Sequence, residues 1–304
     1  MRIVVNGQQA FGKAVLDALV ERGEDVVAVY AASKRPGGRP DPLKEAAVAH
    51  GLPVYEPTTF KTPEVHDEMK ALEPDFCVMA FVTLIVPEEF LDIPLEGTVQ
   101  YHPSLLPRHR GPSAINWAII QGETRTGLSI FWPDKGLDTG PILMQKEVEI
   151  SEEDTLGSVY FERLFPMGVE AMVESVDRVR DGNAPKIPQD ETQATYESWC
   201  TRDEVRIGWD RPLDEVYNLI RGANPQPGAW TAYDGKTLQI YDVGKSAEAG
   251  GEPGEVVDVT DEGFAVAARG GRILVKRVRP EGGDKIAAGA FAAGDGPVKG
   301  TRLG

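Results

Sequence analysis

Residues 2–30 read RIVVNGQQAFGKAVLDALVERGEDVVAVY, and this stretch carries the pattern that decides the fold. The run at 2–6 predicts a strand, the spacing of apolar residues over 11–22 predicts a helix, and 25–30 predicts a second strand. This order indicates a βαβ unit and hence a parallel sheet. The first loop lacks the GxGxxG spacing of a dinucleotide-binding turn, because the glycine after Gly7 is Gly12. The opening therefore predicts a Rossmann-like α/β sheet and disfavours a dinucleotide site.

The α/β pattern continues through the first two thirds of the chain. The apolar run 76–86 predicts a buried central strand, and further strands are expected near 98–101 and 128–132. Residues 154–181 have helical periodicity and predict a helix kinked at Pro166. The expected fold is an open, mostly parallel sheet with helices.

The last third has the pattern of a small β domain. After a short helix ending at Gly222, β-type runs separated by Gly, Asp and Pro follow at 237–243, 254–259, 263–268 and 272–278. Several short strands with one helix predict a small OB-like barrel. We therefore expect an α/β catalytic domain at 1–185, a linker at 186–205 and a C-terminal β-barrel domain at 206–304.

The composition is typical of a soluble globular protein. Of 304 residues, 41% are hydrophobic and 26% charged. Two cysteines are too few for a disulfide framework, which favours a reducing compartment, and the longest apolar run is too short to cross a bilayer. No leader sequence precedes the first strand pattern, so a cytoplasmic location without membrane contact is expected.

The net charge of −16 disfavours a polyanionic partner such as a nucleic acid, although a local basic patch would counteract it. The candidate patch is Arg269, Arg272, Lys276, Arg277 and Arg279. A plain charged face on the strands of a β domain is the favoured interpretation of these residues.

Residues 101–111, read YHPSLLPRHRG, carry most of the functional information. X-Pro steps make this segment a loop of restricted shape directly after a strand, where α/β proteins place active sites. Asp138 lies in a second turn-forming cluster, GLDTGP at 136–141, which is expected to meet His102 at the same edge of the sheet. Gln100 shares a strand face with His102. A histidine, a carboxylate and an amide together can stabilise an oxyanion and accept a proton from a nucleophile.

Other chemistries fit the sequence less well. Ser104 lacks a nucleophile elbow, His102 and His109 lack zinc-site spacing, and no CxxC motif is present. For Arg108 and Arg110 two alternatives stay open, namely attraction of an anionic substrate tail and pairing with acidic groups of the protein itself.

The segments 102–111 and 136–140 resemble the signature of the 10-formyltetrahydrofolate-dependent formyltransferases. The resemblance extends over most of the chain, and within this family it is greatest to the hydrolase domain of 10-formyltetrahydrofolate dehydrogenases and next to methionyl-tRNA formyltransferases. It implies a catalytic Asn, His and Asp, of which His102 and Asp138 match the last two. Gln100 occupies the Asn position, and its extra methylene shifts the amide by roughly 1.5 Å.

The resemblance also implies where the donor binds. The pterin is expected beside the 80–88 and 132–139 loops, lined by Phe81, Val82, Leu84, Ile85, Pro133 and Asp134. Ser104, Arg108 and Arg110 complete the expected substrate-binding residues.

The implied reaction moves the formyl group of 10-formyltetrahydrofolate to water, which gives tetrahydrofolate and formate, or to an amine. The expected donor is 10-formyltetrahydrofolate, and no metal is required. The alternatives are formylation of methionyl-tRNA or of an amino-sugar nucleotide, and a folate- or nucleotide-binding module without catalysis.

Overall fold

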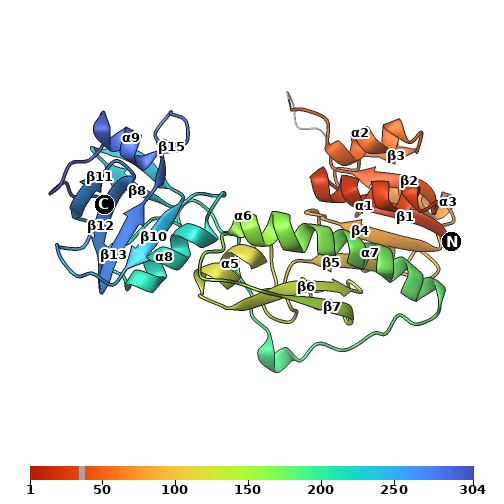
Figure 1. Cartoon of the computed structure of the whole chain (residues 1–304). Coiled ribbons are helices and arrows are strands. Elements are labelled where there is room, and N and C mark those ends of the chain that lie inside the picture. The colour runs from red at the N-terminus through yellow and green to blue at the C-terminus, as the bar shows by residue number, and fades with distance from the viewer. Residues whose placement is uncertain (34–37) are drawn as a thin grey trace. The chain divides into compact units, whose positions relative to one another are not determined.

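The computed structural model describes residues 1–33 and 38–304 (Figure 1). By Cα proximity the chain forms two compact units and passes between them more than once. The first unit holds Met1–Gly111, Gly127–Glu147 and Arg163–Tyr196, and the second holds Pro112–Thr126, Val148–Glu162 and Glu197–Gly304. The contiguous domain bounds 1–185, 186–205 and 206–304 stay a prediction, because compact packing does not by itself define a domain that folds alone.

The first unit is built on a seven-stranded sheet with the order β3-β2-β1-β4-β5-β6-β7. Its strands are β1 (Arg2–Gly7), β2 (Asp25–Ala31), β3 (Val54–Tyr55), β4 (Phe76–Ala80), β5 (Thr98–His102), β6 (Arg125–Phe131) and β7 (Ile142–Glu149). The four pairings among β1 to β5 are parallel, whereas β6 pairs antiparallel with β5. The predicted mostly parallel α/β sheet is thereby confirmed.

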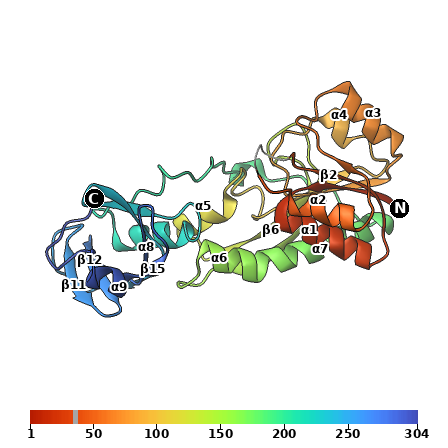
Figure 2. The ribbon, with the colours of Figure 1, turned by 90° about the horizontal axis from the view of Figure 1, so that it is seen from above.

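Helices cover both faces of this sheet (Figure 2). On one face lie α1 (Gln9–Glu21), α2 (Pro42–Ala49) and α7 (Phe165–Arg180), and on the other lie α3 (Pro63–Ala71) and α4 (Glu88–Leu91). The aromatic contacts follow these two layers. Phe11 of α1 packs on Tyr101 of β5 with ring centroids 4.4 Å apart, and Phe90 of α4 packs on Tyr30 of β2 at 5.6 Å. Each face thus has an apolar layer of its own, as a doubly covered parallel sheet requires.

The predicted helix over 154–181 is confirmed for residues 156–180, although its turns are not all α-helical. The segment consists of α6 (Leu156–Ser158), a π-helical stretch η1 (Val159–Leu164) and then α7. Pro166 lies where the π-helical stretch passes into α7, and the kink expected at this proline stays a prediction.

The predicted strand over 76–86 is too long, because β4 ends at Ala80. Phe81 has φ of 65°, a left-handed backbone that cannot continue a strand. Beyond it Val82 and Val86 are half-buried, Leu84 is exposed, and Ile85 keeps 76% of its surface accessible. An apolar run therefore predicted burial where the chain forms an exposed loop.

The second unit contains two four-stranded antiparallel sheets, in the orders β10-β13-β12-β11 and β15-β14-β9-β8. Their strands are β8 (Trp230–Tyr233), β9 (Lys236–Ile240), β10 (Val243–Ser246), β11 (Val256–Thr260), β12 (Gly263–Ala268), β13 (Gly271–Val275), β14 (Arg277–Pro280) and β15 (Ile286–Ala287). The helices are α5 (Ala114–Ile120), the short α6, α8 (Leu213–Gly222) and α9 (Ala288–Ala293). This arrangement agrees with the predicted small barrel-like domain.

Two strands predicted in this unit are each a pair of shorter strands. The run 237–243 divides between β9 and β10, and 272–278 divides between β13 and β14, with the members of each pair in different sheets. In the proposed basic patch, Arg272 pairs with Glu248, Arg277 pairs with Asp242, and Arg279 donates to a backbone carbonyl. These contacts favour a charged strand face.

Within the described part of the chain, no helix combines the length and the apolar character needed to cross a membrane.

Substitution Gly7→Ala tests the close approach of β1 and β4. A Cβ at Gly7 would lie 2.3 Å from the carbonyl oxygen of Ala80, so one strand would have to move. We expect urea denaturation to give a free energy of unfolding about 1–3 kcal/mol lower, the usual result of overpacking. Gly244→Ala is the control, because its Cβ would meet no atom closer than 3.6 Å. Equal stability of the two variants would contradict this close contact.

Candidate active site

His102 and Asp138 form a buried pair in the first unit. The His102 ring nitrogen Nδ1 lies 3.6 Å from Asp138 Oδ2, and the two side chains are only 6% and 7% exposed. Nε2 contacts the carbonyl oxygen of His109 at 2.8 Å, and because a carbonyl only accepts, Nε2 carries the proton of that bond. The backbone N–H of Gly111 donates to Asp138 Oδ2 at 2.9 Å. The imidazole and the carboxylate are therefore both held by the 102–111 loop.

The two residues do not meet at a shared edge of parallel strands, and that prediction is wrong. β6 is antiparallel to β5, with His102 opposite Ser129. The loop after β5 folds back along β6, where Ser129 Oγ donates to the carbonyl of Ser104 and accepts from the N–H of Leu106. The loops bring His102 and Asp138 together, and the strand ends do not.

Three residues in the loops of this site have a left-handed backbone. Phe81, His109 and Asp138 have φ of 65°, 54° and 56°, although none is a glycine. Such a conformation costs of the order of 1–3 kcal/mol per residue and persists only where the surroundings hold it. Strain of this kind is typical of functional sites, and here it falls on the loop after β4 and on both loops that carry the His102–Asp138 contact.

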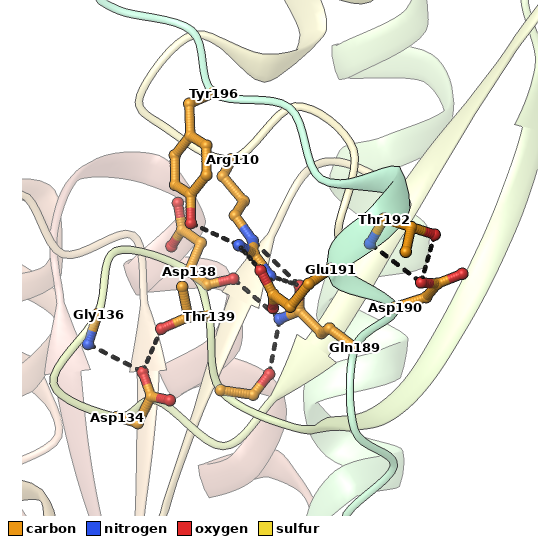
Figure 3. Close-up of polar contacts among 11 residues, drawn as sticks. Arg110, Asp134, Gly136, Asp138, Thr139, Gln189, Asp190, Glu191, Thr192 and Tyr196 are labelled. Atoms are coloured by element: carbon orange, nitrogen blue, oxygen red, sulfur yellow. Dashed lines mark hydrogen bonds and ion pairs between the residues drawn. The ribbon is translucent and has the colours of Figure 1, made fainter.

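The Asp138 loop is tightly packed on itself. A Cβ at Gly140 would lie 1.8 Å from the carbonyl oxygen of Trp132, so only glycine fits there. Asp134 accepts hydrogen bonds from the Gly136 N–H at 3.0 Å and from the Thr139 hydroxyl at 2.5 Å (Figure 3). The Asp134 carboxylate therefore shapes the loop, and its expected contact with substrate stays a prediction.

Gln100 lies on β5 two residues before His102, so both face the same side of the sheet. It is half-buried. Across the sheet, Gln100 lies beside Met79 of β4, and Met79 lies beside Asn6 of β1. Its amide is thus placed on the face of β5 that also carries His102.

The residues expected to line a pterin slot lie in two loops. Phe81, Leu84 and Ile85 are exposed, whereas Val82 and Pro133 are half-buried. Exposed apolar side chains after a strained residue are suited to covering an apolar ligand. Their role as a folate slot stays a prediction. Among residues 1–33 and 38–304, no group of three or more His, Cys, Asp or Glu side chains is placed to hold a metal ion.

For Arg110 the structure shows pairing within the protein. Its side chain is fully buried and makes five hydrogen bonds, which use all five guanidinium N–H groups. The acceptors are the Gln189 amide oxygen, both Glu191 carboxylate oxygens and the Tyr196 hydroxyl (Figure 3). No donor is left for an anionic substrate tail.

The other two polar residues of this loop differ from Arg110 and from each other. Ser104 is fully buried and donates to the carbonyl of Arg108 at 2.6 Å, so its hydroxyl supports the loop. Arg108 itself is exposed. Substrate contact by either residue stays a prediction.

The sequence pattern did not predict that residues 187–196, which we call the strap, contact the candidate site. These residues were expected within a linker, but they belong to the first unit and pair with both loops. Ile187 bridges Ile142, the His109 N–H donates to Thr195 Oγ1 at 2.8 Å, and the Arg110 N–H donates to the Thr195 carbonyl at 3.0 Å. A polar run without periodicity gives no signal of such pairing.

Two family profiles and several known proteins match this chain. A family profile described as "Formyl transferase" matches residues 1–176, and one described as "Formyl transferase, C-terminal domain" matches 200–296. The methionyl-tRNA formyltransferase of Geobacter sulfurreducens is 38% identical over 309 residues, which cover 100% of this chain and 97% of that protein. The cytosolic 10-formyltetrahydrofolate dehydrogenase of Xenopus laevis is 37% identical over 306 residues, which cover 96% of this chain but only 34% of that protein.

One solved structure with a similar fold is HypX from Aquifex aeolicus in complex with tetrahydrofolic acid. Its TM-score is 0.69 at 19% identity, and the match covers 96% of this chain and 47% of HypX.

The Arg110–Glu191 pair predicts a pH-dependent stability. Hydrogen bonds from Arg110 hold the pKa of the Glu191 carboxyl below its ordinary value, and the same contact raises the pKa of Arg110. Because folding lowers the pKa of Glu191, the pair stabilises the protein at neutral pH, and this contribution is lost as the pH falls through the lowered pKa. We expect Glu191→Gln to lower the melting temperature at pH 7 and the difference from wild type to shrink below about pH 4.

The control for this measurement is Glu96→Gln, a change at an exposed glutamate of the same unit. A difference for Glu191→Gln that persists at acid pH would show that the ion pair is not its source.

Proposed function

The chain belongs to the formyl transferase family, and from that premise we propose that it acts on 10-formyltetrahydrofolate and moves the formyl group to water or to an amine. The observation that carries the proposal is the buried contact between His102 and Asp138. Relatives that match nearly the whole chain are named for this donor or for formyl transfer, which supports the same reaction.

In the first step the nucleophile attacks the formyl carbon. The oxygen of water, or the nitrogen of an amine, forms a bond to that carbon, and the π electrons of the carbonyl move to its oxygen. The released proton goes to the Asp138 carboxylate, with His102 Nδ1 beside it at 3.6 Å. Because the Gly111 N–H already holds Asp138 Oδ2, the carboxylate accepts the proton with little reorganisation.

In the second step the intermediate collapses. The Gln100 amide and the His102 imidazole, which shares the proton taken up by Asp138, stabilise the negative formyl oxygen. The bond between the formyl carbon and N10 of the folate breaks, and the proton held by His102 and Asp138 moves to N10. The products are tetrahydrofolate and formate, or tetrahydrofolate and a formylated amine.

The choice between water and an amine rests on three observations. The match to methionyl-tRNA formyltransferase over 97% of that protein favours an amine. The net charge of −16 opposes a polyanionic acceptor, and Gln100 at the position of the family's asparagine alters the oxyanion donor. We therefore place hydrolysis first and transfer to methionyl-tRNA or an amino-sugar nucleotide second.

One experiment separates the candidate functions. The protein is incubated with 10-formyltetrahydrofolate alone, with methionyl-tRNA, and with an amino-sugar nucleotide, while formate and tetrahydrofolate are measured. Formate release without an acceptor supports hydrolysis, and turnover that needs an acceptor supports transfer. Binding of tetrahydrofolate without any turnover leaves only a folate-binding module.

Substitution Asp138→Asn tests the proton acceptor. The amide keeps the size of the side chain but cannot take the proton, so we expect kcat/KM to fall about 10²- to 10⁴-fold. The measurement is release of tetrahydrofolate under the conditions that support turnover of the wild type. Asp67→Asn is the matched control, because that carboxylate is 75% exposed on the surface. Full activity of Asp138→Asn would refute the mechanism.

Substitution Gln100→Leu tests the oxyanion donor. Leucine has a similar size but no N–H group, and loss of one such donor typically lowers kcat about 10²- to 10³-fold. KM for the folate is expected to stay within a few-fold, because the donor acts on charge that develops in the transition state. A raised KM at unchanged kcat would instead assign Gln100 to substrate binding.

A further inference from the structure

Gln189 of the strap connects the two loops that hold His102 and Asp138 (Figure 3). Its Nε2 donates to the carbonyl oxygens of Asp138 at 2.9 Å and Gly140 at 2.7 Å. Its Oε1 accepts from Arg110 Nε at 3.2 Å and Nη2 at 2.7 Å. The Gln189 amide therefore contacts both loops, with its N–H groups on the Asp138 loop and its oxygen on Arg110 of the His102 loop.

The Arg110 end of this connection is linked to the imidazole. Arg110 follows His109, whose carbonyl accepts the hydrogen bond from His102 Nε2 at 2.8 Å. His109 has a left-handed backbone, and its N–H is held by Thr195 of the strap. Fixing Arg110 and His109 fixes the acceptor that sets the orientation of the His102 ring.

The other end of the connection holds the backbone of Asp138. With φ of 56°, Asp138 is in a conformation that it keeps only when its surroundings enforce it. Gln189 holds its carbonyl oxygen, and the Gly111 N–H holds its carboxylate at 2.9 Å. Rotation of the carboxylate away from His102 is opposed from both sides.

We propose that Gln189 is a positioning residue for formyl transfer, acting by its N–H bonds to the Asp138 loop to keep that carboxylate in place beside His102. The proposal rests on the function proposed above. The competing role is structural, in which Gln189 serves only as an acceptor for the buried Arg110.

Two substitutions at Gln189 separate these roles. Gln189→Glu keeps an acceptor for Arg110 but replaces the N–H donors by an oxygen that faces two carbonyl oxygens. Gln189→Leu removes both the donor and the acceptor. The matched controls are Gln193→Glu and Gln193→Leu, which make the same changes at an exposed glutamine of the strap.

The experiment measures kcat and KM for 10-formyltetrahydrofolate and the melting temperature of each variant. We expect both Gln189 variants to lower kcat about 10- to 100-fold, because a displacement near 1 Å at a reacting group has an effect of this size. KM is expected within about threefold of the Gln193 controls, because no contact with the folate is removed. The melting temperature of Gln189→Glu is expected to fall less than that of Gln189→Leu, since Arg110 keeps its acceptor only in the first variant.

Two results would contradict the positioning role of Gln189. Wild-type kcat in Gln189→Glu, with loss only in Gln189→Leu, would assign Gln189 to the structural role and overturn the proposal. A kcat that falls only in proportion to the folded fraction would do the same. If Gln189→Leu does not fold, Gln189→Met takes its place as a neutral variant of equal length. Absence of turnover in the wild type would count against the proposed function, whereas normal turnover in Gln189→Glu counts against this inference alone.

Discussion

The hydrogen bond from the Gly111 N–H to the Asp138 carboxylate is the interaction on which the candidate site depends. It joins two loops that are 27 residues apart in the chain, and it is buried. A buried carboxylate is unfavourable unless donors or a cation stabilise it, and Asp138 has this N–H and the imidazole of His102 beside it. The bond therefore both stabilises the charge and sets the position of the group that would accept a proton.

A second constraint comes from Arg110, whose side chain is fully buried. A buried guanidinium is tolerated only when its N–H groups are paired. The strap supplies them through Gln189, Glu191 and Tyr196. The need to pair one cation thus explains why a polar segment lies against the loops, and that segment in turn places Gln189 against the backbone of Asp138.

Much of the fold follows from patterns that are local in the sequence. The βαβ opening and the residues of the two motifs were recognisable because periodicity and turn residues act between neighbours in the chain. The errors have physical reasons as well. The run after Ala80 is apolar, yet it leaves the sheet at the left-handed Phe81, and no local pattern distinguishes an exposed apolar loop from a buried strand. The direction of β6 depends on its pairing with β5 and has no signature of its own.

The sequence by itself determined the class of the fold, the family, and His102, Asp138 and Gln100 as the residues of interest, because each of these follows from short segments. Only the tertiary structure decided how these residues are held. The partners of Asp138 and Arg110 lie 27 to 86 positions away, Gly111 on the other loop and Gln189 and Tyr196 on the strap. A hydrogen bond depends on distance and angle in space, and a sequence pattern specifies neither for residues so far apart in the chain.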